Sequence, residues 1–138
     1  MLVPAKTKYR KEQKGGKKIN GVASSGYSIK FGTFALKALE PALLNSKQIE
    51  SARKVVSRYI KKSGKLWILV FPHTPRTKKP AEVRMGSGKG NVEFYVAKIQ
   101  PGRIIFEIDG VDAESANTLL TKAGAKLPFK TKVVSLLV

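Results

Sequence analysis

Cysteine is absent from this chain of 138 residues, and histidine occurs once. Without cysteine the chain can form neither disulfides nor thiolate metal sites, and a single histidine cannot build a zinc site. That histidine, His73, lies in the proline-bounded segment 71–75, where an exposed side chain is the ordinary expectation. We therefore expect no metal and no other cofactor.

Extended apolar stretches are missing as well. A membrane-spanning helix needs about 18 or more consecutive apolar residues, and no such stretch is present. The first residues, MLVPAKTKYRK, lack the apolar segment of a secretory signal peptide. They also lack the arginine-rich and serine-rich character of an organellar transit peptide. We expect the protein to stay in the compartment where it is made.

Acidic residues are few. Nine Asp and Glu stand against 27 Lys and Arg, which gives a formal net charge of +18. The chain is also 42% hydrophobic, enough for the core of a single domain of this length. Such an excess of positive charge repels itself unless a polyanion neutralises it. A folded domain that binds nucleic acid is therefore the favoured interpretation, and charge kept for solubility is the weaker alternative.

The segment 83–96, VRMGSGKGNVEFYV, is the most informative part of the chain. Its three alternating glycines allow another molecule to approach the main chain closely, and Arg84 and Lys89 supply positive charge there. A nucleotide-binding P-loop would require glycine and a hydroxyl where Val83 and Gly90 stand, so that interpretation fails. A basic loop directed at a polyanion is favoured, and a flexible surface hairpin remains the alternative.

Residues 1–26 form a separate basic arm. Positions 1–30 carry eight Lys and Arg against one acid. Such a segment cannot bury enough surface to fold alone, but it can become ordered by neutralising phosphates. A solubilising tail is the alternative; Tyr9 favours binding because an aromatic ring can stack on a base. The predicted contacts are Lys6, Lys8, Tyr9, Arg10, Lys11, Lys14, Lys17 and Lys18.

Apolar patterning predicts the strands of one domain. Their predicted ranges are 27–39, 65–71, 92–99, 103–109 and 131–138. The strand 65–71 is almost continuously apolar, which is typical of a central strand, and we expect Trp67 in the core. The strands 92–99 and 103–109 are separated by a short turn and are predicted to form an antiparallel hairpin.

Two helices are predicted, over 46–63 and 112–123. Asn45 and Gln48 have the spacing of a capping box at the start of the first helix. The outer face of this helix is almost wholly positive, which favours contact with a nucleic-acid backbone over a solvated face of mixed charge. Its predicted contacts are Arg53, Lys54, Arg58, Lys61 and Lys62. The second helix has few positive charges and is expected to face away from the nucleic acid.

The order of these elements indicates an α+β fold, with two helices packed on a mostly antiparallel sheet. Residues 72–91 show little periodicity and are predicted to form one long glycine-rich loop, which at this length is usually functional. The predicted organisation is a basic extended N-terminal arm over 1–26 and a single RNA-binding domain over 27–138. The acids lie at helix starts, strand ends or strand faces, and no pair is placed for acid–base chemistry, so we expect no enzymatic activity.

Several collinear stretches resemble the large-ribosomal-subunit protein sixteen family of bacteria and organelles. They are MLVPAKTKYRKEQKG at 1–15, FGTFALKA at 31–38, QIESARK at 48–54, GKLWILVFP at 64–72, KPAEVRMGSGKGNVEFYVAKIQPG at 79–102, FEIDGV at 106–111 and AGAKLPFKT at 123–131. Together they span nearly the whole chain, and the block at 79–102 is highly specific. The chain departs from the family pattern at three positions. Ala5 stands where a basic residue is common, His73 stands where an acid is common, and Ser87 stands where the family usually has lysine.

The resemblance implies a structural constituent of the large ribosomal subunit that binds large-subunit rRNA, lies near A-site and P-site tRNA, and touches neighbouring ribosomal proteins. In the family the basic arm enters rRNA and the glycine-rich loop points toward the tRNAs. The residues expected near tRNA are Lys78, Lys79, Arg84, Met85, Gly86, Ser87, Gly88, Lys89, Gly90 and Asn91. Some bacterial members carry a hydroxylated arginine that would map to Arg84.

The expected location is the ribosome, in the cytoplasm of a bacterium or in the matrix or stroma of an organelle. Two other functions remain open on the residues alone. One is a free architectural protein that binds DNA or RNA, and the other is an RNA-processing enzyme.

Overall fold

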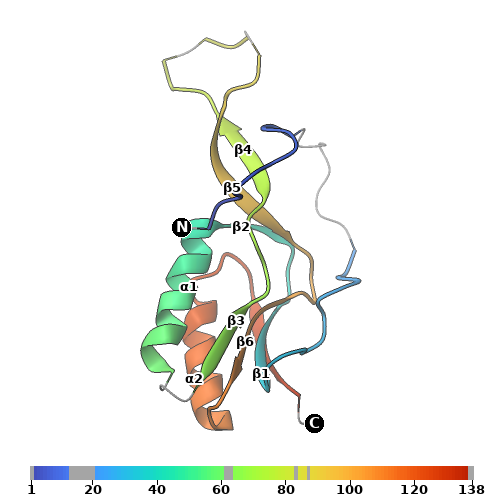
Figure 1. Cartoon of the computed structure of the whole chain (residues 1–138), viewed down its shortest axis with the longest axis vertical. Coiled ribbons are helices and arrows are strands. Elements are labelled where there is room, and N and C mark those ends of the chain that lie inside the picture. Colours follow the sequence, from blue (N-terminus) through green and yellow to red (C-terminus); the bar gives the residue numbers. More distant parts are fainter. Residues whose placement is uncertain (1, 13–20, 61–63, 83, 87, 137–138) are drawn as a thin grey trace.

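The computed structural model describes residues 2–12, 21–60, 64–82, 84–86 and 88–136. Within these residues the chain forms two helices and seven strands, and every strand pair is antiparallel. The predicted α+β class is confirmed (Figure 1). In chain order the elements are β1 (Phe34–Ala38), β2 (Ala42–Asn45), α1 (Ser46–Tyr59), β3 (Lys65–Ile68), β4 (Thr74–Lys78), β5 (Asn91–Ile99), β6 (Ile104–Asp109), α2 (Ala113–Gly124) and β7 (Thr131–Ser135).

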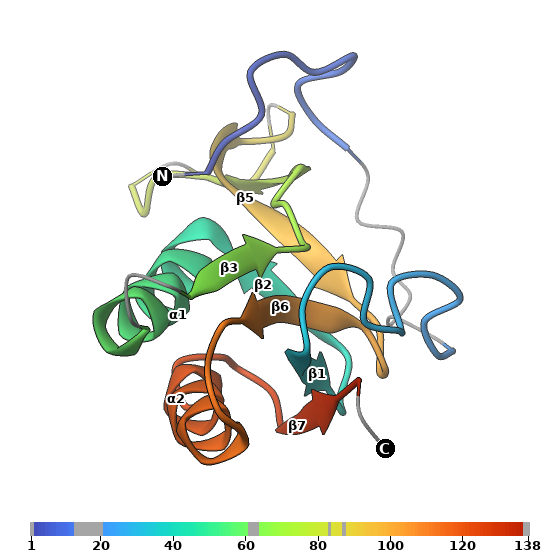
Figure 2. The same cartoon turned by 60° about the horizontal axis from the view of Figure 1, so that its bottom comes forward.

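The strands form two sheets. One has four strands in the order β3-β6-β1-β7, and the other has three in the order β2-β5-β4. Figure 2 shows α1 and α2 side by side on one side of the four-stranded sheet, with the segment 21–33 on the other. The core lies between the helices and this sheet, where Leu36, Ile49, Phe106 and Leu120 are fully buried. The β4–β5 hairpin extends away from that core and carries the glycine-rich loop at its far end (Figure 1).

The start of α1 follows from its sequence. The amide of Gln48 donates to the Asn45 side chain at 2.9 Å, and the amide of Asn45 donates to the Gln48 side chain at 3.1 Å. This is the predicted capping box, and it is confirmed. The helix ends at Tyr59 with Ile60 as the C-cap, earlier than predicted. Residues 61–63, which include Lys61 and Lys62, lie outside the described residues.

The predicted hairpin between the strands now seen as β5 and β6 is wrong. The turn at 101–102 exists, and Gly102 has a φ of +91°, but it passes the chain from one sheet to the other. β5 pairs with β2 and β4, whereas β6 pairs with β1 and β3. Alternation identifies a strand and its buried face, but it does not identify the partner strand.

The apolar run at 65–71 is an edge strand and not a central one. β3 covers Lys65–Ile68 and pairs with β6 alone. Its apolar character has a different cause, because the segment before β1 covers its outer face. There Phe31 stacks on Trp67, with ring centroids 6.1 Å apart and planes 22° apart. Trp67 is half-buried under this ring and does not belong to the core cluster, so the expectation of a core tryptophan is wrong.

The predicted strand 27–39 is shortened to β1, and the residues before it are held in an irregular path by Glu107. The carboxylate of Glu107 is fully buried and accepts the backbone N–H groups of Lys30, Phe31 and Gly32 at 2.8, 2.7 and 3.0 Å. Gly32 is required here because an added Cβ would lie 2.5 Å from the carbonyl oxygen of Ile108.

The apolar pattern of the sequence did not predict two of the strands, β2 and β4. β2 has four residues directly before the cap of α1, too few to show a period. β4 reads TPRTK, which is polar, and it falls inside the predicted loop 72–91. It pairs with β5 from Thr74↔Val96 to Lys78↔Asn91, so the long-loop prediction is wrong for residues 74–78. The loop proper runs from 79 to 90.

Candidate nucleic-acid interface

The described part of the basic arm is exposed. Lys6, Lys8, Tyr9, Arg10 and Lys11 all have exposed side chains, and the Lys8 ammonium lies 5.7 Å from the centre of the Tyr9 ring. The predicted contacts Lys14, Lys17 and Lys18 lie outside the described residues. The arm is anchored at both of its ends.

One end of the arm is Leu2, which packs against the hydrophobic core. At the other end the amide of Ala23 donates to the carbonyl of Pro101 at 2.9 Å, and the carbonyl of Gly26 accepts from the amide of Ile104 at 2.8 Å. The basic residues therefore belong to a segment that leaves the domain and returns to it.

The glycine-rich loop is open at its tip. Gly86 and Gly88 have φ values of +107° and +87°, and nothing lies within 4 Å of a Cβ placed on either. Met85 is completely exposed, and the Lys79 ammonium donates to the carbonyl of Gly86. Positive φ and open space allow another backbone to come close at these two positions. Ser87 lies outside the described residues.

The base of the loop is built differently. A Cβ at Gly90 would lie 2.8 Å from the carbonyl oxygen of Lys78, so this glycine permits close packing within the hairpin. Lys78, Arg84, Lys89 and Asn91 are exposed around the loop, and Lys79 is half-buried. The predicted loop residues that the structure describes thus share one protruding feature.

The arm and the loop meet. The Lys11 ammonium donates to the carbonyl of Lys89 at 3.1 Å, and the Lys89 ammonium donates to the carbonyl of Glu12. These residues are 77 to 78 positions apart in the sequence. Two regions that the sequence marked separately as basic therefore form one surface. Nothing in the local pattern of either region predicts this contact, because it depends on the unpredicted β4–β5 pairing.

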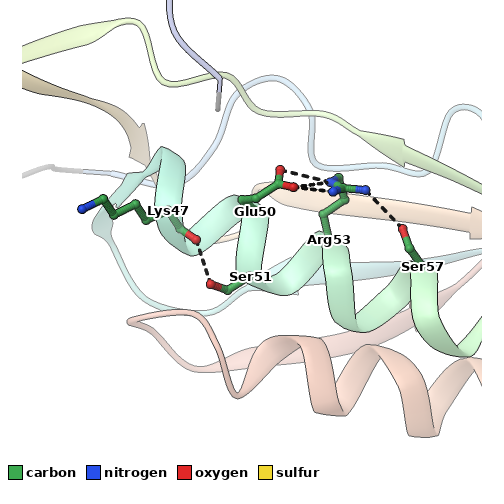
Figure 3. Close-up of polar contacts among 5 residues, drawn as sticks. All are labelled: Lys47, Glu50, Ser51, Arg53 and Ser57. Carbon is green, nitrogen blue, oxygen red and sulfur yellow. Dashed lines mark hydrogen bonds and ion pairs between the residues drawn. The ribbon is translucent and has the colours of Figure 1, made fainter.

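The basic residues on the outer face of α1 differ in their surroundings. The Arg53 guanidinium donates from Nε to both carboxylate oxygens of Glu50, at 3.1 and 3.0 Å, and from Nη1 to the Ser57 hydroxyl at 3.4 Å (Figure 3). A third N–H group, on Nη2, also donates to Glu50. These hydrogen bonds lower the pKa of Glu50 and raise the pKa of Arg53. Arg53 already has an anionic partner, whereas Lys54 and Arg58 are exposed.

A pocket opens between the ends of the two helices. Its volume is about 430 Å³, and it is lined by Lys54, Val55, Arg58, Tyr59, Lys122, Ala125 and Lys126. Tyr59, the last residue of α1, is 51% exposed although the apolar side chains Ile49, Ala52 and Val56 of this helix are buried. The Lys122 ammonium lies 4.4 Å from the centre of its ring. The C-terminal end of α2 therefore shares a basic surface with α1.

Comparison with known proteins decides the family. The family model described as ribosomal protein L16p/L10e matches residues 4–134. This chain belongs to the ribosomal protein L16p/L10e family. The resemblance seen in the sequence is thereby confirmed.

Relatives of the same family agree over almost the full length. A protein of Rhodopseudomonas palustris named large ribosomal subunit protein uL16 is 54% identical over 135 residues, which cover 98% of this chain and 97% of the relative. Proteins with the same name from Nitrobacter hamburgensis and Afipia carboxidovorans are 53% and 54% identical with the same coverage. The L16p/L10e match therefore covers the arm, the hairpin and both helices together.

The described part of this L16p/L10e chain shows no sign of two other kinds of site, a metal site and a membrane span. Among the described residues, no group of three or more His, Cys, Asp or Glu side chains could hold a metal ion. No helix in the described ranges is long and apolar enough to cross a membrane. The pocket beside β3, of about 460 Å³, contains Arg103, whose guanidinium is bound to the carbonyls of Leu69 at 3.0 Å and Ser25 at 3.4 Å. That arginine ties the returning arm to the domain.

Proposed function

We propose that this chain is a structural constituent of the large ribosomal subunit. In this role it binds large-subunit rRNA through its basic arm and the outer face of α1. Its glycine-rich loop lies beside A-site and P-site tRNA, and it has no catalytic activity of its own. The observation that carries the proposal is the joint surface of arm and loop, where Lys11 and Lys89 each donate to the backbone of the other segment.

The electrostatics support a polyanionic partner. The chain has a net charge of +18, and described cations of the arm, the loop and α1 are exposed. Each phosphate neutralised by a lysine or arginine releases counterions, which is the main sequence-independent contribution to such binding. The relatives named large ribosomal subunit protein uL16 point to rRNA as that polyanion. The ribosome is accordingly the proposed location, with neighbouring ribosomal proteins as further partners.

The shape of the hairpin supports the part of the proposal that concerns tRNA. A loop anchored by paired strands is held at a distance from the domain, while its tip stays open at Gly86 and Gly88. Arg84, Met85 and Lys89 are exposed beside that tip. Positive charge and an accessible backbone together suit the approach of a nucleic-acid strand.

Co-sedimentation tests the rRNA part. The labelled full-length chain is mixed with large-subunit rRNA at moderate salt, and duplex DNA is added as competitor. We expect the chain to stay with the rRNA. If duplex DNA displaces it as well as excess rRNA does, the free architectural nucleic-acid-binding protein is the better description. A chain that remains unbound would contradict the proposal.

Site-directed crosslinking tests the tRNA part, and the absence of native cysteine makes it specific. Met85→Cys places a photo-crosslinker on a fully exposed residue of the loop. Lys132→Cys, an exposed position on β7, is the matched control. In ribosomes carrying A-site and P-site tRNA we expect crosslinks to tRNA from position 85 and none from position 132. Equal labelling from both positions would contradict a loop directed at tRNA.

A further inference from the structure

The pocket between α1 and α2 gathers positive charge from two elements. Lys54 and Arg58 come from α1, Lys122 comes from the last turn of α2, and Lys126 comes from the turn that follows α2. None of the lining residues is acidic. Of the described carboxylates, Glu114 lines a separate pocket that shares Tyr59 and Lys122, and Glu50 lies one turn before Lys54 on α1, bonded to Arg53.

Such a cluster is unfavourable without an anion. Four cationic side chains repel one another when they line one pocket, and Glu50, the carboxylate that interacts electrostatically with Lys54, is already hydrogen-bonded to Arg53. The apolar lining comes from Val55, Ala125, the ring of Tyr59 and the aliphatic stems of the basic side chains. Every ionisable head group at the pocket that is charged near neutral pH is a cation, so an anion finds hydrogen-bond donors from both sides.

The volume indicates the size of that anion. About 430 Å³ lies within the range of roughly 300–1,000 Å³ that small-ligand pockets occupy. It is larger than a bare phosphate needs and suits a phosphate with its attached ribose. Tyr59 adds an aromatic edge to the pocket, and its ring is held in place by the Lys122 ammonium.

We propose that this pocket binds a backbone phosphate of large-subunit rRNA, with Lys54, Arg58 and Lys126 as its ligands and Lys122 as the residue that fixes Tyr59 at the pocket wall. The inference rests on the proposed rRNA binding and extends it to α2. It assigns a positioning contact to a helix whose composition predicted that it would face away from nucleic acid. Phosphate contacts of this kind orient a protein on RNA without reading its sequence.

Lysine acetylation tests the site without any substitution. The full-length chain is acetylated free, bound to large-subunit rRNA alone, and within complete large subunits. We expect Lys54, Lys122 and Lys126 to be protected by rRNA alone, while Lys132 stays reactive. If protection appears in the complete subunit and not with rRNA alone, the pocket binds an acidic segment of another ribosomal protein, and the proposal is overturned.

A charge-removal pair measures the contribution. Lys122→Gln/Lys126→Gln is compared with Lys37→Gln/Lys132→Gln, which also removes two charges. Lys37 and Lys132 are cross-strand partners on β1 and β7. The side chain of the preceding residue, Thr131, faces α2. Because successive side chains of a strand point to opposite faces, the control pair lies on the face of the sheet away from the helices. Circular dichroism confirms that both variants are folded.

The first variant should weaken rRNA binding several-fold. It should also reduce the slope of log affinity against log salt by about 1, since each phosphate contact contributes about 0.7–0.9. The control should change the slope by less than half of that. Equal effects of both pairs, or no effect of the first, would overturn the phosphate site while leaving rRNA binding intact. A chain that binds no rRNA at all would instead overturn the proposed function.

Discussion

Glu107 is the buried charge on which the start of the four-stranded sheet depends. Its carboxylate accepts three consecutive backbone N–H groups, and charge-assisted hydrogen bonds of this kind are stronger than neutral ones. Glu107→Gln keeps the size of the side chain but places an amide N–H group against backbone donors. We expect the free energy of unfolding in urea to fall by about 2–3 kcal/mol.

The matched control for that change is Glu93→Gln, an exposed position on β5. It should leave the free energy of unfolding within about 0.5 kcal/mol of the native value. A Glu107→Gln protein as stable as the control would show that the three hydrogen bonds contribute little. The hydrogen bond from the Phe31 backbone to Glu107 also accounts for the position of the Phe31 ring, which is stacked on Trp67 although Phe31 is 58% exposed.

The pair of Glu50 and Arg53 makes part of the stability dependent on pH. Arg53 lowers the pKa of Glu50, so the ionised carboxyl stabilises the folded state above its unfolded pKa of 4.5. This contribution is lost as the pH falls through the lower pKa of the folded state. We expect the difference in free energy of unfolding between the native chain and Glu50→Gln to be constant near neutral pH.

Below about pH 4.5 that difference should shrink, because the native carboxyl then becomes protonated. Urea unfolding between pH 3 and pH 7 measures it. Since the pair lies on the surface, 1 M salt should also reduce the difference at pH 7. A difference that is independent of both pH and salt would mean that Glu50 acts through helix packing and not through its charge.

Helix α1 depends on the capping box that the sequence predicted. Asn45→Ala removes the side-chain acceptor of the Gln48 amide, and loss of such a cap typically destabilises a protein by about 1 kcal/mol. Asn117→Ala, an exposed position within α2, is the control and should be neutral or slightly stabilising, because alanine has the higher helix propensity. Thermal and urea unfolding of both variants distinguish the outcomes. Equal stability of the two would argue against the cap.

The elements that the sequence predicted well are those whose signals are local. The cap at Asn45, the buried face of α2 and the alternation of β5 all depend on neighbours within a few residues. The elements that it missed depend on distant partners. β4 is polar because it lies in a protruding hairpin, and β3 is apolar because Phe31 covers it. Pairing between strands far apart in sequence is decided by the whole fold and not by alternation.

The candidate site shows the same division. Composition identified the arm, the loop and the α1 face, because each is a local excess of Lys and Arg. It did not predict that Lys11 and Lys89 touch, nor that Lys122 and Lys126 join Lys54 and Arg58. Lys122 lies in the last turn of α2 and Lys126 lies two residues beyond the end of the helix at Gly124, so no helical spacing connected them in the sequence. Only the three-dimensional structure shows that α1 lies beside this segment and completes the pocket between the two helices.

In the molecule as a whole, the residues that stabilise the fold and the exposed cations of the basic arm lie in different parts of the chain. The core is built from the helices and the four-stranded sheet, while the arm leaves that core at Leu2 and returns at Ala23. We therefore expect the exposed cations Lys6, Lys8, Arg10 and Lys11, which lie between these anchors, to contribute to binding and not to folding. Removing charge from the arm, with both anchors kept, should weaken rRNA binding strongly and change the free energy of unfolding little.

A variant in which Lys6, Lys8, Arg10 and Lys11 are all replaced by Gln would test this expectation. All four native side chains are exposed in the structure. The free energy of unfolding should stay within about 0.5 kcal/mol of the native value or rise, because self-repulsion is reduced. The slope of log rRNA affinity against log salt should fall by about 3, from the loss of up to four phosphate contacts. Urea unfolding and salt-dependent binding measure the two effects on the same protein. A large loss of stability with an unchanged slope would show that the arm belongs to the core and not to the interface.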